Sequence, residues 1–521
     1  MKGAVAAGHP RTAEAGARVL AEGGNAVDAC VAAAFASWVA ESPLTGPGAG
    51  GFALVVPADG RPARVADFFV ATPGLGLRDG AGAEMEAVDV GFGGDAETTQ
   101  VFRIGEAAVA VPGAAAGLAA LHRAYGSLPW AELVQPALEL ARAGVRLTRP
   151  QAHLHGILDL ILRHSTEGRR LYSRADGSRL AVGDLLRLAG LDETLERLAR
   201  DPRALYRGEL AAAVARTVTD GGGLLTTADL GRYRVVWRRP VRVRAFGHET
   251  VSNPPPSSGG VLIALGLALL EAHGIGEAGS AEAIEALVET MREQTRVRSG
   301  GFERDLRRGG LPGRLLARPA VRAALQRMAV SGPGAAEPAA PGGTTHISVV
   351  DGAGGAASLS CSTGSGSGVI VAGTGIHLNN MLGEYDLTAG APRSPGHRLT
   401  SMMAPTAVMG PAGPRLVVGS AGSVRLRGAI LQVIVNVLGH GLGVEESIDR
   451  PRVHLDEPHV HCEGGFDPAE LRRVAADGYA VVRWRRRNLF FGGTNAVEVL
   501  PDGSLAAAGD PRRGGAGIVV D

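Results

Sequence analysis

The pattern of apolar and polar positions predicts two consecutive helices near the start of the chain. Residues 11–24 have a helical pattern that stops at Gly23-Gly24. Asn25 follows as a helix N-cap with Asp28 three residues later, which predicts a second helix over Ala26–Ala40. That helix is apolar on almost every side, so we expect it to be buried between layers of the fold.

Strands and further helices follow this pair. A glycine-rich loop, Gly46–Gly51, leads into an apolar run that is typical of a strand at Phe52–Val56. A turn at Asp59-Gly60 then returns the chain through a second strand. The other elements predicted before residue 300 are that second strand at Val65–Phe69, helices within 113–145, strands within 230–252 and a helix over Ser258–His273.

The pattern changes near the middle of the chain. Gly332–Gly343 contains only Gly, Pro, Ala and one Glu, without periodicity, which indicates a loop or linker. Thr345–Val350 and Ala357–Cys361 then have strand patterns on either side of a turn, which predicts a hairpin. Helices are expected over Val424–Leu438 and Pro468–Ala476. Paired strands with separate helices favour an α+β fold in which helices pack on antiparallel sheets.

Composition narrows the class of protein. Hydrophobic residues make up 45% and charged residues 20% of the 521 positions, as in a folded rather than a disordered chain. With 53 basic and 52 acidic residues, the net charge of +1 gives no electrostatic reason to bind nucleic acid or an anionic membrane. Three widely spaced cysteines argue against a disulfide framework or a zinc site. The first ten residues lack a long apolar segment, so we expect a cytoplasmic protein.

The loop Gly46–Gly51 matches the pattern G-x-G-x-x-G of dinucleotide-binding proteins. That fingerprint requires a strand before the loop and a helix after it. Here a predicted helix precedes the loop and a strand follows it. We therefore interpret the glycines as a tight loop that approaches another backbone segment.

Thr344 stands at the junction between the linker and the hairpin. Cleavage of the peptide before it would free an α-amine, whose usual pKa is about 7.7–8. Such an amine is partly neutral near pH 7 and can serve as the base for the hydroxyl of the same residue. One residue would then supply both nucleophile and base, although a strand start after a linker would show the same local pattern.

Thr344–Asp351 resembles the start of the small subunit of gamma-glutamyltranspeptidases, a family of N-terminal-nucleophile hydrolases. The resemblance covers nearly the whole chain. It implies a four-layer αββα fold and self-cleavage between Gly343 and Thr344. The products would be a large subunit, residues 1–343, and a small subunit, residues 344–521, which together form one core. Further matching segments are Gly23–Asp28, Gly48–Leu54, Val111–Gly113, Gly221–Leu225, Pro254–Gly260, Gly373–Asn380, Met403–Thr406, Gly419–Gln432 and Asp510–Arg512.

The resemblance assigns roles to individual residues. Thr344 matches the nucleophile, and Ser362 stands where the family has a threonine whose hydroxyl bonds that nucleophile. Gly422 and Ser423 stand where two glycines supply backbone N–H groups to the oxyanion hole. A backbone donor does not require glycine, so Ser423 can keep this function. Ser401 matches one of two serines in the substrate pocket.

The same resemblance shows departures in the substrate pocket. Phe69 stands where the family has an arginine that holds the α-carboxylate of the gamma-glutamyl group, and a phenyl ring cannot form that bidentate pair. Met381 and Met402 replace a glutamine and a serine, and Gly364 replaces an asparagine. Glu384 takes the place of the aspartate that binds the substrate amine. We expect a pocket with apolar walls and one retained negative charge.

Two further features bear on the pocket and on cofactors. The lid that covers the acceptor in this family is shortened between Tyr385 and Met403, and Arg78 could replace the lost arginine. The histidine pairs His459/His461 and His153/His155 have no clear third ligand nearby, so a metal site is not expected. The threonine mechanism requires no metal and no cofactor.

These observations favour a self-processing threonine hydrolase or acyltransferase. Its partner would be a small-molecule acyl substrate, and water or an amine would resolve the acyl-enzyme. The acyl group could be gamma-glutamyl, as in glutathione, or a more apolar one. One alternative is a homologue of the proteins in alkyl-proline antibiotic pathways that break a C–C bond with the same threonine. Another is a binding or scaffold protein that has kept the fold without the activity.

Overall fold

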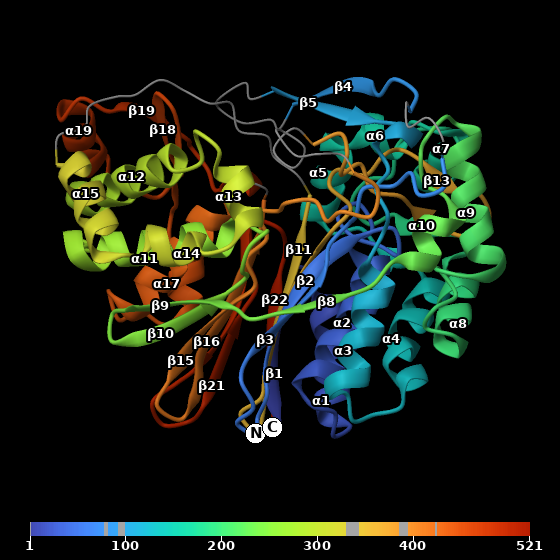
Figure 1. The fold of residues 1–521 in the computed structure, drawn as a ribbon, viewed down its shortest axis with the longest axis horizontal. Helices are drawn as coiled ribbons and strands as arrows, with labels where there is room; N and C mark the ends of the chain where they lie inside the picture. The colour runs from blue at the N-terminus through green and yellow to red at the C-terminus, as the bar shows by residue number, and fades with distance from the viewer. Residues whose placement is uncertain (1, 78–81, 92–98, 330–342, 385–393, 423–424) are drawn as a thin grey trace.

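Two stacked β-sheets with helices on both outer faces form the body of the protein (Figure 1). This four-layer arrangement confirms the expected α+β class and the αββα order. The computed structural model describes residues 2–77, 82–91, 99–329, 343–384, 394–422 and 425–521.

The first sheet has seven strands in the order β22-β1-β11-β12-β2-β3-β8, and each neighbouring pair is antiparallel. Because β1 pairs with β22, the two ends of the chain lie side by side (Figure 1). The strands are β1 Gly3–Ala7, β2 Gly50–Val56, β3 Arg64–Phe68, β8 Val236–Arg238, β11 Thr345–Asp351, β12 Ala356–Ser362 and β22 Ala516–Val520.

The second sheet has six strands in the order β21-β20-β16-β15-β10-β9, again antiparallel throughout. Both sheets combine strands from before and after Gly343, so neither part of the chain contains a complete sheet. The strands are β9 Val241–Ala245, β10 His248–Ser252, β15 Thr406–Gly410, β16 Gly413–Ala421, β20 Gly493–Val499 and β21 Leu505–Ala508.

Helices cover the two outer faces. On the first sheet lie α1, α2 and α3, with α4 packed against α2. On the second sheet lie α11 and α17, with α12 packed against α11. These helices are α1 Pro10–Ala21, α2 Ala26–Ala40, α3 Ala114–Tyr125, α4 Trp130–Ala143, α11 Gly259–His273, α12 Ala281–Arg296 and α17 Leu426–Leu438.

Smaller elements surround these layers. Short helices extend the helical layers, and four small sheets of two or three strands lie outside the main sheets. The longer of these additional helices are α5 Arg149–Ile157, α8 Leu191–Arg200, α9 Gly208–Asp220, α15 Arg318–Met328 and α19 Pro468–Ala476. The small sheets are β4 Glu86–Gly91 with β5 Thr99–Ile104, β6 Val145–Arg146 with β7 Leu185–Leu186, β13 Ile370–Val371 with β14 Ile376–His377, and β17 Val453–Asp456 with β18 His459–Cys462 and β19 Ala480–Arg483.

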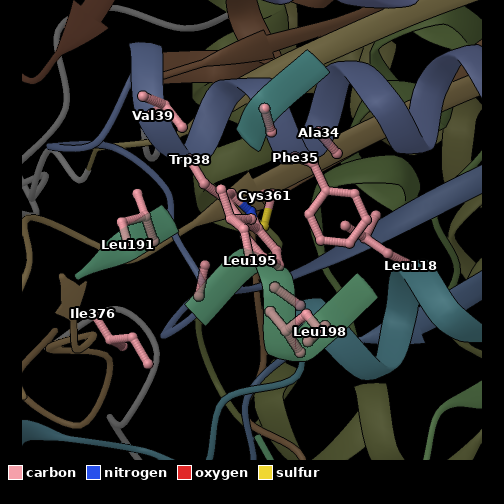
Figure 2. Close-up of a cluster of buried hydrophobic side chains, with 14 of the residues drawn as sticks. Ala34, Phe35, Trp38, Val39, Leu118, Leu191, Leu195, Leu198, Cys361 and Ile376 are labelled. Carbon is pink, nitrogen blue, oxygen red and sulfur yellow. The ribbon is translucent and has the colours of Figure 1, made fainter. Parts of the chain in front are cut away.

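Three apolar layers hold the fold together. One lies between the first sheet and its helices, where Phe35 and Trp38 of α2 pack among residues such as Leu118, Leu198 and Cys361 (Figure 2). A second lies between the two sheets, and a third lies between the second sheet and α11 and α17. Because α2 is buried on every side, it needs the nearly continuous apolar sequence that predicted its position.

The predicted boundaries were largely right. Helix α2 spans Ala26–Ala40, and the Asn25 side chain accepts hydrogen bonds from the first turn while Asp28 closes a capping box. Helix α1 ends at Ala21, earlier than predicted, because Gly24 N–H turns back to the Val19 carbonyl at 2.9 Å. The expected strand region 230–252 begins instead with a short helix, α10 Thr227–Arg232, which Thr226 and Asp229 stabilise through a capping box.

Candidate active site

The strand register places Thr344 opposite Ser362. Thr345 pairs with Cys361 in the β11–β12 ladder, so the preceding residue, Thr344, faces Ser362. Cys361 and Ile347 point into the apolar layer beside α2. Side chains alternate along strands, so Thr344 and Ser362 both point to the other face, toward the second sheet. The hairpin register therefore brings the two side chains to one face of the sheet, while the expected bond between their hydroxyls stays a prediction.

Hydrogen bonds hold the peptide that joins Gly343 to Thr344. The Gly343 N–H donates to the Gly364 carbonyl at 2.9 Å. The Ser362 hydroxyl donates to the Gly343 carbonyl oxygen, and the Gly364 N–H donates to the Ser362 hydroxyl at 2.8 Å. Thr344 is only 4% exposed. The carbonyl that would be attacked in self-cleavage therefore already has a hydroxyl donor.

The loop after β12 explains why Gly364 stands where related proteins have asparagine. Gly364 has φ +73°, a conformation that favours glycine. A β-carbon there would clash with Asn380 Oδ1 and would lie 2.6 Å from Glu384 Oε1. Asn380 fixes the loop by accepting from Ser365 N–H at 3.0 Å and donating to the Ser365 hydroxyl at 2.8 Å. The structure thus places Glu384 beside the loop that holds Gly343.

The glycine-rich loop also supports the site. It follows α2 and precedes β2, and Gly48 forms a parallel bridge with Leu378. A β-carbon at Gly48 would lie 3.0 Å from Leu378 Cα and closer still to the His377 carbonyl. Asn379 Nδ2 donates to the Gly48 carbonyl at 2.8 Å. The predicted close approach of two backbones is confirmed.

Gly422 directly follows the last residue of β16, Ala421. Its φ is +128°, and a β-carbon would lie 3.0 Å from Gly492 Cα, so glycine is required there. The same β-carbon would lie 3.8 Å from Arg513 Nη2. Arg513 Nη1 donates to the Thr344 carbonyl at 3.4 Å. The second predicted oxyanion donor, Ser423, lies outside the described residues.

Three of the predicted pocket residues belong to one apolar cluster. Phe69, Met381 and Met402 are between 1% and 6% exposed and lie in the layer between the two sheets. The Phe69 ring stacks on Phe52 with ring centroids 5.4 Å apart. The Tyr233 hydroxyl fixes the backbone by donating to the Phe69 carbonyl at 2.6 Å.

Two arginines bind the carboxylate of Asp67, close to Phe69 in the chain. Asp67, two residues before Phe69, is buried and accepts from Arg238 Nε at 2.8 Å. Arg398 lies on its other side, with Nε 3.3 Å from Asp67 Oδ1, and its guanidinium covers the Tyr233 ring at 4.3 Å. Both guanidiniums therefore stabilise a buried carboxylate of the protein. Arg78, the other candidate, lies outside the described residues.

Ser401 is buried and tied to the loop before α11. Its hydroxyl accepts from the Met403 N–H at 3.1 Å, and its carbonyl accepts from the Ser257 hydroxyl at 2.8 Å. The Ser258 hydroxyl donates to Met402 Sδ at 2.8 Å. These contacts fix the segment that carries both Ser401 and Met402. Of the predicted short lid between residues 385 and 403, positions 385–393 lie outside the described residues.

Buried polar side chains support β11 on both faces. His346 contacts the Ser360 hydroxyl at 2.9 Å and the Ser348 hydroxyl at 3.0 Å, and burial lowers the pKa of His346 to about 3. On the other face, the Thr345 hydroxyl donates to Glu41 at 2.5 Å. Burial raises the pKa of Glu41, against the effect of this hydrogen bond.

The predicted histidine pairs make other contacts. His461 accepts from Trp484 Nε1 at 3.1 Å, and burial lowers its pKa to about 4. His155 packs on Tyr172 with ring centroids 5.6 Å apart. In the part of the chain that the structure describes, no group of three or more His, Cys, Asp or Glu side chains has a metal-binding arrangement.

Sequence reasoning missed three contributors to the site. Asn380 ends the matching segment Gly373–Asn380 but was given no role, and Glu41, directly after α2, is marked by no local pattern. Arg513 directly follows the motif Asp510–Arg512, so its position in the chain gave a weak signal. The pairing of β22 with β1 and the buried ion pairs of Asp510 bring this segment to Thr344.

Comparison with known proteins identifies the family. The family model described as Gamma-glutamyltranspeptidase matches residues 12–520. The chain belongs to the gamma-glutamyltranspeptidase family. It is 31% identical to the glutathione hydrolase proenzyme of Escherichia coli strain K12, over 98% of this chain and 90% of that protein. It is 32% identical to the acylase ACY 1 proenzyme of Pseudomonas sp. strain SE83, over 100% of this chain and 94% of that protein.

Solved structures agree with this membership. The cephalosporin acylase from Bacillus halodurans has the same fold, with a TM-score of 0.84 at 24% identity, covering 99% of this chain and 95% of that one. The gamma-glutamyltranspeptidase of Helicobacter pylori gives a TM-score of 0.54 at 26% identity, covering 61% of this chain and 90% of that one. The protein is a gamma-glutamyltranspeptidase-like N-terminal-nucleophile hydrolase. None of its described helices is long and apolar enough to span a membrane.

Proposed function

We propose that this member of the gamma-glutamyltranspeptidase family cleaves itself between Gly343 and Thr344, and that Thr344 then acts as the nucleophile of an amide hydrolase or acyltransferase. The observation that carries the proposal is the hydrogen bond from the Ser362 hydroxyl to the Gly343 carbonyl, with Thr344 opposite Ser362 in the ladder. Relatives named as proenzymes support a precursor that is processed.

Processing begins with attack of Thr344 Oγ on the Gly343 carbonyl carbon. The C–N bond of the peptide breaks, and Gly343 becomes an ester on the threonine hydroxyl. Water then hydrolyses this ester, which releases the Gly343 carboxylate and restores Thr344 Oγ–H with a free α-amine. The Ser362 hydroxyl stabilises negative charge on the Gly343 oxygen during attack, because it already donates to that atom.

Turnover uses the same atoms on an external amide. The α-amine accepts the proton of Thr344 Oγ while Oγ attacks the substrate carbonyl. Backbone N–H groups at Gly422 and the following residue would stabilise the oxyanion. The leaving amine takes the proton, and water or an acceptor amine attacks the ester to release the acyl group. The two subunits stay joined through the mixed sheets, so cleavage leaves the site assembled.

The acyl group is proposed to carry an apolar part beside the scissile bond. We expect the acyl pocket to be formed by Phe69, Met381 and Met402, which share one apolar cluster, and methionine adapts its shape to different groups. Arg238 and Arg398 are engaged by Asp67 and so do not offer a guanidinium to a substrate carboxylate. Glu384, near Gly364, supplies a negative charge suited to a substrate ammonium group. Acylases among the relatives support this choice over strict gamma-glutamyl specificity.

A covalent adduct would test the proposal and name the substrate class. The processed protein is incubated with a panel of amides that combine gamma-glutamyl or apolar acyl groups with aromatic amines, and then quenched in acid. Mass spectrometry of the small subunit should find an acyl group on Thr344, with the Thr344→Ala variant as control. An adduct on another residue, or release of the aromatic amine by the alanine variant at the wild-type rate, would contradict the mechanism.

A further inference from the structure

Arg513 approaches Thr344 along a rigid part of the chain. The preceding residue, Arg512, is buried, and its Nη1 lies 3.2 Å from Asp510 Oδ1. Asp510 also pairs with Arg452 at 2.7 Å. These contacts fix the backbone at Arg513, whose side chain packs against Gly493. Its Nη1 donates to the Thr344 carbonyl at 3.4 Å.

The charge of Arg513 has no direct carboxylate partner among the described residues. Among the described residues, no carboxylate oxygen lies within 4.0 Å of the Arg513 guanidinium nitrogens. Arg513 Nε is buried and forms no hydrogen bond with a described residue. Burial lowers the pKa of Arg513 to about 10, although the more distant Asp510 and Glu41 favour its charged form. Burying a charge without direct pairing destabilises a fold. The guanidinium of Arg513 donates to the Thr344 carbonyl, so its positive field acts on Thr344.

We propose that Arg513 is a positioning residue whose positive charge keeps the freed α-amine of Thr344 neutral and able to accept the Oγ proton. The inference rests on the proposed cleavage, which creates this amine. A neighbouring cation disfavours an ammonium group, since two like charges repel. Arg513 has no part in bond making, and its effect reaches the substrate only through Thr344.

Other charged groups around Thr344 also affect the pKa of its α-amine. Glu384 lies beside Gly364 in the loop after β12, and Glu41 accepts a hydrogen bond from Thr345; both carboxylates would favour an ammonium group. Burial raises the pKa of Glu41, which favours its neutral form and so weakens its stabilisation of an ammonium group. Arg425 adds a second positive charge at the start of α17, but its guanidinium is directed to the Phe490 ring, 4.2 Å away.

The buried histidines are the remaining titratable neighbours. His346 lies two residues along β11, and His9 lies beside Glu41 in the same cavity that Arg513 lines. Burial lowers the pKa of His346 to about 3 and that of His9 to about 4, so both are neutral at pH 7. Of the described cations, Arg513 alone donates a hydrogen bond to a Thr344 atom.

The size of the effect follows from Coulomb's law. The amine and the guanidinium are roughly 6 Å apart, since the hydrogen bond ends on the carbonyl of the same residue. A unit charge at that distance shifts a pKa by roughly 0.5 units in a water-like medium and by roughly 2 units near a protein surface. Removing the charge should therefore raise the pKa of the amine by about 0.5–2 units, which is roughly a 3- to 100-fold loss of neutral amine at low pH.

Trace labelling with acetic anhydride measures this pKa without any substrate. The processed protein is exposed to the reagent across a pH series, and mass spectrometry quantifies acetylation of the peptide that begins with Thr344. The variants are Arg513→Gln, the charge-preserving Arg513→Lys, and Arg472→Gln, which removes an exposed charge from α19. Arg513→Gln should raise the pKa of the amine by about 0.5–2 units. Arg472→Gln should leave it within roughly 0.3 units of wild type, and Arg513→Lys, which keeps part of the charge, should raise it less than Arg513→Gln does.

Any other result would overturn the proposed role of Arg513. An unchanged pKa in Arg513→Gln, or an equal rise in Arg472→Gln, would show that the charge does not act on the amine. If Arg513→Gln or Arg513→Lys remained uncleaved, Arg513 would act on the precursor instead. If the wild-type protein itself carried no Thr344 N-terminus, the proposed function would fail first, and the absence of the labelled peptide would reveal this.

Discussion

The substitution Ser362→Ala removes the hydroxyl that links the scissile peptide to the loop after β12. Ser362 donates to the Gly343 carbonyl and accepts from the Gly364 N–H at 2.8 Å. During self-cleavage, negative charge develops on the same Gly343 oxygen. Ser362 is 3% exposed, so water cannot easily take over its contacts.

Two effects of different size are expected from this change. Losing one donor to a developing oxyanion raises the barrier by about 2.7–4 kcal/mol, so self-cleavage should slow roughly 10²- to 10³-fold. The Gly364 N–H also loses its acceptor, which should lower the free energy of unfolding by about 1–3 kcal/mol. Ser362→Thr keeps the hydroxyl and is the matched control, with cleavage expected within about tenfold of wild type.

A cell-free translation pulse followed by denaturing gels gives the cleavage rate directly. Precursor should disappear quickly in the wild type, slowly in Ser362→Ala, and not at all in Thr344→Ala. Circular dichroism of each purified variant separates slow chemistry from misfolding. Wild-type cleavage rates in a folded Ser362→Ala protein would refute the role given to this hydroxyl.

Two further predictions concern specificity and pH. Wild-type kcat/KM on a gamma-glutamyl anilide should lie more than a hundredfold below ~10⁴ M⁻¹s⁻¹, because an unpaired substrate carboxylate costs about 3–5 kcal/mol. The variant Phe69→Arg should restore part of this activity. Steady-state kinetics measure both proteins, and a wild-type value of ~10⁴ M⁻¹s⁻¹ or above would contradict the reassigned pocket. Burial holds the pKa of His346 at about 3 in the folded state, against 6.5 for the ordinary group, so the unfolded chain binds a proton first as the pH falls. Stability should therefore be lost from about pH 6.5 downward, by on the order of 3 kcal/mol from this residue at pH 4. Thermal unfolding of the wild type and of His346→Gln between pH 7 and pH 4 measures this contribution, and an equal fall of the melting temperature in both proteins would contradict the assignment.

Much of the fold could be predicted because local signals were strong. Asn25 and Asp28 marked the start of α2, and the apolar run after them marked its burial. The strand patterns on either side of the turn after Asp351 predicted the hairpin, whereas the link between Thr344 and Ser362 came from the family resemblance, and the register of the ladder now places them opposite each other. Both signals come from neighbouring residues, whose spacing alone determines which side chains share a face.

The rest of the site depends on contacts between distant segments. Gly364 could be recognised as a departure from the family pattern, but the reason for it, the side chains of Asn380 and Glu384, appears only in the folded loop. Arg513 lies 169 residues from Thr344 in the chain and reaches it through the pairing of β22 with β1. Helix α10 was also not predicted. The capping box at Thr226 stabilises this short helix directly before the segment whose pattern favours strands.

The N-terminus of the small subunit tests the central claim most directly. The purified protein should give two chains on a denaturing gel, and N-terminal sequencing of the smaller should show that it begins at Thr344. Thr344→Ala should remain one chain. A wild-type protein that stays intact while turning over an amide, or a small chain that begins at another residue, would contradict the account.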